Sequence, residues 1–343
     1  MKIHYQRANT GHKFDLVWLL SSVFLAAIVI LVIVASLHED AEKDVKGSLE
    51  ERFASELIIE ANGKRYGYRE WQTKTVLVIG VDSYGLQTES NTYRGGPQAD
   101  FLLLLSVDRE DRTVRSLQID RDTLADIDIC GILGNSLGQR RTQICLAQSF
   151  GNSIGTGTKN TAAAVSRLLC GIPIDHYIVF DMESVNRIND LLDGVTVTLQ
   201  DDLTMLDPML ENGAAVTLRG KQAELFVRGR RDVADGTNAN RMRRQKVYIE
   251  SAIQKCREFV ETDPEYFTYL VEGVEDCYYT DLTRAELIGL LNRIAGYTAE
   301  ESSQIDGEYV IGSDGFREFL ADEKDLTDKV IGLCFQEIFP KEG

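Results

Sequence analysis

Short apolar runs separated by polar turns mark the chain from residue 75 onward. Residues 75–80 and 101–107 are largely apolar, and residues 113–119 alternate between apolar and polar positions. Runs of this length and pattern predict buried or half-buried β-strands. Because only the short turn 108–112 joins the second strand to the third, we expect these two strands to be antiparallel neighbours.

The rest of the chain alternates between strand and helix patterns, with no internal repeat and no clear linker. Residues 130–145 and 151–159 are rich in polar residues and glycine, and we expect loops there. The other predicted elements are strands at 175–181 and 194–199 and helices at 160–169, 182–192, 219–227, 283–294 and 326–339, with one more helix from about Asn240. This alternation predicts one α/β domain.

Residues 16–37 form an apolar run interrupted only by Ser21, Ser22 and Ser36. A helix needs about 20 such residues to cross a bilayer core, so we expect a membrane span. Lysine and arginine precede the run and acids follow it, which predicts a cytoplasmic tail at 1–15 and an extracytoplasmic chain after residue 37. The alternative is a cleaved signal peptide, whose apolar core has only about 7–15 residues.

The segment 38–70 is predicted to be a charged stalk or cap, and 71–343 to be the extracytoplasmic domain. The 343 residues are 43% hydrophobic, enough for a large core, and carry a formal net charge of -17. That charge argues against a general nucleic-acid binder, which needs a broad basic surface. Six cysteines without a close CxxC pair permit disulfides, and Cys130 with Cys145 is the first pair we expect.

A basic segment stands out in this acidic chain. Residues 228–246 contain seven Arg or Lys residues against two Asp. Arginine presents a planar fork that matches phosphate or carboxylate oxygens, so the segment indicates a local anion partner. A helix from about Asn240 would place Arg241, Arg244 and Gln245 on one face. The alternative is a solvated basic helix face.

Carboxylates follow or open each of the first three predicted strands. Asp82 follows the first strand, Asp100 opens the second, and Asp120, Arg121 and Asp122 follow the third. If these strands are antiparallel neighbours, the residues converge at one edge of the sheet, where hard cations such as magnesium could find oxygen ligands. The alternative is ordinary turn acids. We expect His176 to be structural.

The order of motifs resembles the LytR-CpsA-Psr family of membrane-anchored cell-envelope transferases, from about residue 75 to 255. The motifs are VIGVDS (78–83), QAD (98–100), QIDRDT (118–123), IDHY (174–177), DGVTV (193–197), GKQA (220–223), VRGR (227–230) and RMRRQ (241–245). The resemblance implies a three-layer α/β/α fold with a mixed central sheet, preceded by one N-terminal transmembrane helix.

The same resemblance implies a function. It is the transfer, with magnesium, of a glycopolymer and its proximal phosphate from a polyprenyl-pyrophosphate carrier to peptidoglycan, at the cell membrane with the catalytic domain outside. Other functions compete with it: a non-catalytic module that binds or senses an anionic lipid or polymer, a hydrolase of the lipid pyrophosphate, and a glycan transferase to a protein acceptor. Release of polyprenyl phosphate separates an enzyme from a binder. A requirement for a glycan acceptor separates a transferase from a hydrolase.

The family motifs also imply roles for individual residues. Asp82 and Asp100 match the metal-associated, catalytic aspartates. The positions that hold the pyrophosphate are matched by Arg121, Arg228, Arg230, Arg241 and Gln245. Asp122 is a candidate base for the acceptor hydroxyl. The chain departs from the common pattern at Gln98, where arginine is frequent, and at Asp120, where proline is frequent.

Overall fold

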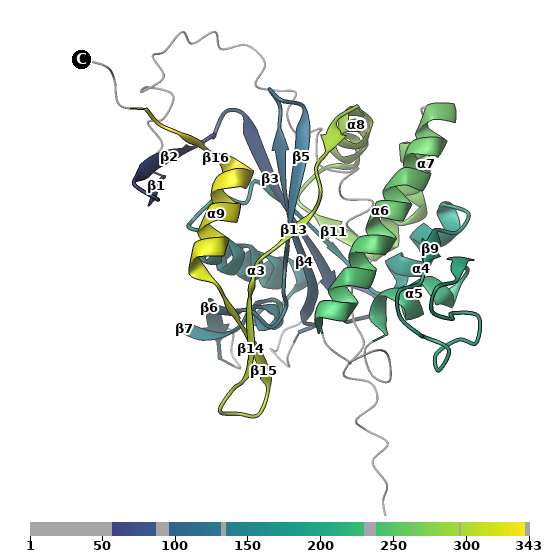
Figure 1. Ribbon diagram of the computed structural model, residues 1–343, viewed down its shortest axis with the longest axis horizontal. Coiled ribbons are helices and arrows are strands. Elements are labelled where there is room, and N and C mark those ends of the chain that lie inside the picture. Colours follow the sequence, from purple (N-terminus) through teal and green to yellow (C-terminus); the bar gives the residue numbers. More distant parts are fainter. Residues whose placement is uncertain are drawn as a thin grey trace, which may run out of the picture.

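The computed structural model describes residues 57–86, 96–131, 135–229, 238–263, 265–294 and 296–339. Its centre is a mixed sheet with the strand order β11-β8-β3-β4-β5-β12, and β13 also pairs with β5 (Figure 1). The strands are β3 (Thr73–Val81), β4 (Ala99–Asp108), β5 (Thr113–Ile119), β8 (His176–Phe180), β11 (Tyr278–Thr280), β12 (Thr298–Ala299) and β13 (Ser303–Gln304). β3, β4 and β5 are antiparallel neighbours, so the predicted strand pairing is confirmed.

Helices cover both faces of this sheet, because alternate side chains of its buried strands enter different cores. In β3, Val76 and Val78 join one hydrophobic cluster, whereas Leu77 and Ile79 join the other. The first cluster packs under α4 (Glu183–Leu191), α5 (Lys221–Arg228), α6 (Asn238–Thr262), α7 (Tyr266–Gly273) and α8 (Arg284–Ile294). On the other face lie α3 (Ile154–Leu168) and α9 (Glu323–Cys334) (Figure 1).

The prediction of a polar loop between residues 130 and 145 is wrong. Ser136–Gln143 form strand β7, which pairs antiparallel with β6 (Leu124–Cys130). Most side chains of β7 are exposed, so main-chain pairing holds a strand that has no apolar periodicity to reveal it. Another short ladder, β9 (Thr196–Thr198) with β10 (Ala215–Thr217), lies outside the central sheet.

Helix α3 begins earlier than predicted, at Ile154 rather than at 160 or 161. Ser153 and Thr156 form a capping box, in which each side chain accepts a hydrogen bond from the other residue's backbone N–H. Gly157 lies where an added Cβ would be 2.3 Å from the carbonyl oxygen of Gln148. Two of the three glycines that suggested a loop, Gly155 and Gly157, therefore belong to the first turn of the helix. There the backbone passes close to the 3-10 helix η2 (Ile144–Ser149).

The two ends of the described chain meet in a small sheet. β16 (Phe335–Glu337) pairs with β2 (Lys64–Tyr68), which pairs with β1 (Ile58–Ala61). The last helix, predicted to reach residue 339, therefore ends at Cys334. Residues 57–70, within the segment expected to be a stalk or cap, contribute β1 and β2. A hairpin of β14 (Gly307–Ile311) and β15 (Arg317–Ala321) precedes α9.

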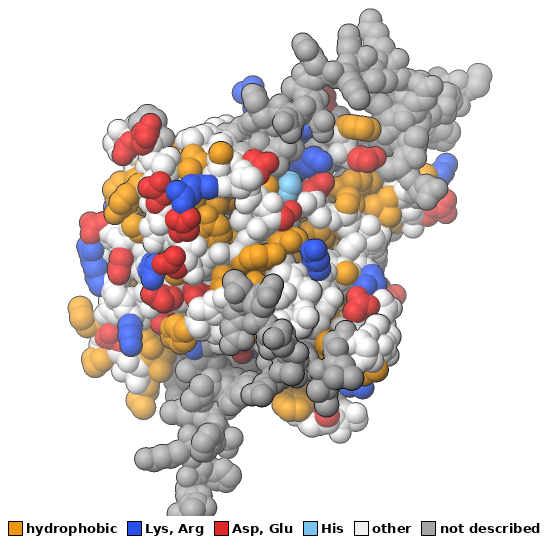
Figure 2. Space-filling view, turned by 180° about the vertical axis from the view of Figure 1, so that it is seen from behind, with side chains coloured by type: hydrophobic (Ala, Val, Ile, Leu, Met, Phe, Trp, Pro, Cys, Tyr) orange, Lys and Arg blue, Asp and Glu red, His pale blue; other side chains and the backbone are white. Residues whose placement is uncertain are grey.

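The apolar run 16–37 lies outside the described residues. Within the described part of the chain, none of the helices combines the length and the apolar character needed to cross a bilayer. On the face shown in Figure 2, acidic and basic side chains are interspersed, without a broad basic area.

The expected disulfide between Cys130 and Cys145 is wrong. All six cysteines lie in the described residues, and all are free thiols there. Cys130 pairs with Ser136 at the far end of the β6–β7 hairpin, whereas Cys145 lies just beyond the end that joins Leu124 to Gln143. Each residue of a strand adds about 3.3 Å, so the two cysteines are much farther apart than the roughly 7 Å limit for the Cα atoms of a disulfide.

This arrangement predicts a graded thiol reactivity. Without reductant, the unfolded protein should titrate as six thiols. In the native protein Cys130 and Cys170, which are half-buried, should react before the four buried cysteines, because the thiolate is the reactive form and burial raises the pKa of Cys145 to about 11 and of Cys256 to about 12. Ellman titration with denaturant measures the total number of thiols, and titration without denaturant measures how many react in the native protein and how fast. Four thiols or fewer in denaturant would contradict the prediction.

Candidate active site

The site begins at a β-bulge that presents Asp100. Gly80 pairs with Phe101 and Val81 with Ala99, so Asp100 is an extra residue in β4. A bulge turns a side chain away from the direction that regular alternation would give it, and bulges are frequent beside active sites. The Asp100 side chain is directed into the protein and is only 1% exposed.

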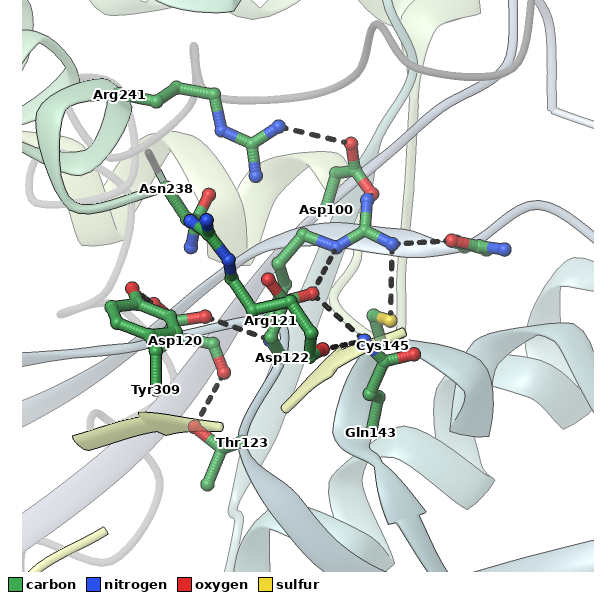
Figure 3. A network of polar contacts seen from close by, with 12 residues as sticks. Asp100, Asp120, Arg121, Asp122, Thr123, Gln143, Cys145, Asn238, Arg241 and Tyr309 are labelled. Atoms are coloured by element: carbon green, nitrogen blue, oxygen red, sulfur yellow. Dashed lines mark hydrogen bonds and ion pairs between the residues drawn. The ribbon is translucent and has the colours of Figure 1, made fainter. Parts of the chain in front are cut away.

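Arginines from separate elements hold the Asp100 carboxylate (Figure 3). Arg121, which follows β5, forms an ion pair from Nη1 to Oδ1. Arg241, in the first turns of α6, places Nη1 3.5 Å from Oδ2. Arg241 is itself only 1% exposed. The predicted convergence of Asp100 with Arg121 is therefore confirmed, and Arg241 is brought there by the packing of α6.

Further contacts fix the guanidinium of Arg121. Its Nη2 donates to Oε1 of Gln98 at 2.5 Å and to Sγ of Cys145 at 3.3 Å, and its Nε lies 3.3 Å from Oδ1 of Asp122. Gln98, where the resemblance made arginine the frequent residue, thus accepts a hydrogen bond from Arg121 and helps to orient its guanidinium.

Asp82 lies beside this cluster. Its Oδ1 accepts a hydrogen bond from the backbone N–H of Gln98 at 2.6 Å. Burial raises the pKa of the Asp82 carboxyl above its ordinary value, against the opposing effects of that hydrogen bond and of the charges of Arg121 and Arg228. These electrostatic interactions place Asp82 in the same site as the arginines.

Arg228 is the last residue of α5 and reaches the site beside Tyr84, which follows β3. It forms an ion pair with Glu224 one turn earlier, and its Nη1 donates to Oη of Tyr84 at 3.1 Å. Tyr84 in turn donates to Glu224 at 2.6 Å. Burial lowers the pKa of Arg228 from its ordinary value, against the opposing effect of Tyr84. Arg230 lies outside the described residues, so its predicted role is unchanged.

Asp120 is buried and braces the loop that carries Arg121 and Asp122. Its Oδ1 accepts from the backbone N–H of Asp122 at 2.8 Å, and its Oδ2 accepts from Tyr309 of β14 (Figure 3). Burial raises the pKa of Asp120, as does the charge of Asp122, and hydrogen bonds from Tyr309 and Asn238 oppose both. Sequence reasoning missed Tyr309 and Asn238, because neither belongs to a motif and Tyr309 is 189 residues away.

Asp122 and Gln245 complete the set of predicted residues. Oδ1 of Asp122 also accepts from Nε2 of Gln143 at 3.2 Å. Gln245 is buried one helical turn after Arg241, on the same face of α6, and accepts a hydrogen bond from Gln118 of β5. His176 lies away from this cluster, beside Asp281, as expected of a structural histidine.

The interpretation of the basic segment as a solvated helix face is wrong for its buried members. Arg241 and Arg244 are among the largest fully buried side chains of the described chain. Arg244 binds Oδ2 of Asp201 at 2.6 Å and the carbonyl oxygens of Phe226 and Gly229. Arg241 thus contacts the acidic cluster, whereas Arg244 ties α6 to the end of α5.

Carboxylate oxygens of the site could hold a hard cation. Among the described residues no three His, Cys, Asp or Glu side chains form a metal cluster, so a cation would have to rely on fewer protein ligands. Oδ1 of Asp100 is buried and makes no hydrogen bond of normal geometry, although it faces Arg121. Magnesium is commonly bound by one or two carboxylates together with water and substrate phosphates. Asp82 and Asp100 fit that pattern.

Comparison with known proteins identifies the family of the chain. The model of the LytR_cpsA_psr family matches residues 32–329, which confirms the resemblance seen in the motifs. Polyisoprenyl-teichoic acid–peptidoglycan teichoic acid transferase TagU of Halalkalibacterium halodurans is 28% identical over 185 residues, 54% of each chain. TagU of Bacillus licheniformis is 27% identical over 259 residues, 74% of each chain. The match thus spans about half of the first relative and about three quarters of the second.

A solved structure shares the fold. TagV of B. subtilis superposes with a TM-score of 0.57 at 21% sequence identity, over 76% of this chain and 96% of TagV.

Neighbouring arginines of α6 should differ in their effect on stability. Replacing Arg244 with alanine leaves the buried Asp201 without its buried partner, so the free energy of unfolding should fall by about 3–5 kcal/mol. Arg243→Ala is the matched control, because Arg243 binds the same carboxylate from a side chain that is 46% exposed, and it should cost less than about 1 kcal/mol. Urea unfolding of both variants measures the difference. Equal losses would refute the structural role of Arg244.

Proposed function

Because the chain belongs to the LytR_cpsA_psr family, we propose that it is a phosphotransferase that moves a glycopolymer, with its proximal phosphate, from a polyprenyl-pyrophosphate carrier to peptidoglycan. The observation that carries the proposal is the buried cluster in which Arg121 and Arg241 share the Asp100 carboxylate, with Arg228 nearby. Planar guanidinium groups that reach one site from separate elements suit an anion with several oxygens. The names of the TagU relatives supply the class of donor and acceptor.

The reaction we propose is a displacement at phosphorus. An acceptor hydroxyl oxygen attacks the phosphorus next to the polymer, the bond to the bridging oxygen breaks, and polyprenyl phosphate leaves with that electron pair. Arg121, Arg241 and Arg228 bind the pyrophosphate oxygens and stabilise the charge that develops on them. We assign the hydroxyl proton to Asp122, whose contacts with Arg121 and Gln143 both use Oδ1.

Magnesium is part of this proposal. Asp82 and Asp100 would hold the ion, which when bound would neutralise charge on the pyrophosphate. The raised pKa of Asp82 has a consequence for such binding, because the carboxyl must be ionised to hold a cation and stays protonated to a higher pH than an ordinary aspartate. Binding should therefore weaken as the pH falls toward the acidic range.

A cavity opens beside Gln118, the side chain that contacts Gln245. It has a volume of about 220 Å³ and lies between β5, β12 and α6. Leu103, Ile249 and Ile253 supply apolar surface, and the remaining lining includes the charged residues Lys246, Glu250, Arg257, Glu300 and Glu301. We assign it to the first part of the polyprenyl chain. The apolar run 16–37 would anchor the protein in the membrane with the domain outside, where such a donor is present.

A reconstituted assay tests the proposal. The full chain in detergent is incubated with a polyprenyl-pyrophosphate-linked glycan, magnesium and peptidoglycan, and the products are analysed by mass spectrometry. We expect polyprenyl phosphate and a glycan joined to peptidoglycan through a phosphodiester. Release of polyprenyl phosphate without a need for peptidoglycan would indicate a hydrolase, and donor binding without any release would indicate a binding module.

Asp100→Asn should reduce turnover by about a hundredfold or more and weaken its dependence on magnesium. The substitution keeps the shape of the side chain but removes the charge that Arg121, Arg241 and the proposed ion share. Turnover against magnesium concentration measures the effect, with thermal unfolding recorded alongside. Asp126→Asn is the control, since it makes the same charge change on an exposed side chain of β6. If the Asp100→Asn curve coincides with that of the wild type, Asp100 has no role in the reaction.

A further inference from the structure

A chain of glutamine side chains crosses from the edge of the sheet to α6. β13 runs parallel to β5 with Gln304 in register with Gln118. Nε2 of Gln304 donates to Oε1 of Gln118 at 3.0 Å, and Nε2 of Gln118 donates to Oε1 of Gln245 at 2.7 Å. The side chains of Gln118 and Gln245 are buried.

This series of hydrogen bonds has a direction, because each amide accepts on its oxygen and donates from its nitrogen. Its last group is Nε2 of Gln245, which is buried and has no hydrogen-bond partner among the described residues. A buried donor without a partner costs about 1–3 kcal/mol, so such a group in a folded protein needs an explanation, and a bound anion is one that its position supports. The oxygen of the same amide is already occupied by Gln118.

The unsatisfied donor lies on the helix face that forms the anion site. Gln245 is four residues after Arg241, and residues with this spacing are neighbours on a helix surface. Arg241 contacts the Asp100 carboxylate. An anion held by Arg241 would therefore lie close to the amide of Gln245.

We propose that Gln304 and Gln118 are positioning residues, which hold the Gln245 amide with its NH2 group toward the pyrophosphate of the donor. If the amide turned over, its carbonyl oxygen would face the anion and repel it. This inference rests on the proposed function. It adds that β13, an edge strand outside the family motifs, determines which end of the Gln245 amide faces the anion.

Gln304→Glu tests the direction of this series of hydrogen bonds. A carboxylate can only accept, so Gln118 must turn to donate to it, and Gln245 must then donate to Gln118. The carbonyl oxygen of Gln245 would face the anion. We expect inorganic pyrophosphate, titrated calorimetrically into the full chain in detergent, to bind about tenfold more weakly than to the wild type, the loss of one hydrogen bond to a charged group.

Gln304→Met removes the directing donor without adding charge. Both orientations of the Gln245 amide should then be populated, and an evenly divided population weakens binding about twofold. Since Gln304 is half-buried at the sheet edge, both variants should fold, and thermal unfolding checks this. A loss for Gln304→Met as large as for Gln304→Glu would contradict the directional account.

A double-mutant cycle separates this account from simple repulsion by the new charge. In a Gln245→Leu background, Gln304→Glu should cause no further loss if it acts through the Gln245 amide. Additive losses would mean that the carboxylate acts by its charge alone, and the inference would be overturned.

Measurements on the wild type distinguish failure of the proposed function from failure of this inference. If it neither binds pyrophosphate nor transfers glycan, the proposed function fails and this inference fails with it. If the wild type does both and Gln304→Glu binds pyrophosphate equally well, only the positioning role is lost.

Discussion

The site depends on one electrostatic constraint, the burial of the Asp100 carboxylate between Arg121 and Arg241. A buried charge is tolerated only when it is paired and hydrogen-bonded. Here one carboxylate is shared by two guanidinium groups that reach it from separate elements. The packing that buries Arg241 keeps its charge in place beside Asp100.

The positions of these arginines depend on the carboxylates that face them. Arg241 and Arg244 are three residues apart on the same helix and equally hidden from solvent. Arg244 meets Asp201 and the end of α5, and so attaches the helix to the domain. Arg241 meets Asp100 at the bulge of β4. The same residue type therefore ties the helix to the domain at one position and faces the carboxylate of the site at the other.

The last third of the chain completes the site. Tyr309 of β14 donates to Asp120, the backbone N–H of Phe319 in β15 donates to the carbonyl of Asp122 at 2.8 Å, and Gln304 of β13 donates to Gln118. The first two contacts hold the loop that carries Arg121 against the β14–β15 hairpin, and the third holds the end of β5. The buried carboxylate of Asp120 gives that loop its hydrogen bond to Tyr309.

The sequence by itself determined the central strands, their antiparallel order and the edge where the acids and Arg121 emerge, because apolar runs and short turns are local signals. Family motifs supplied the roles proposed for Arg228, Arg241 and Gln245. Only the tertiary structure decided what each polar side chain contacts, since the contacts join separate elements, some of them more than a hundred positions apart, as Asp100 with Arg241 and Asp120 with Tyr309 are. The brace by Tyr309 and the direction of the Gln245 amide were beyond prediction for that reason, and strand β7 was missed because its exposed side chains carry no apolar periodicity.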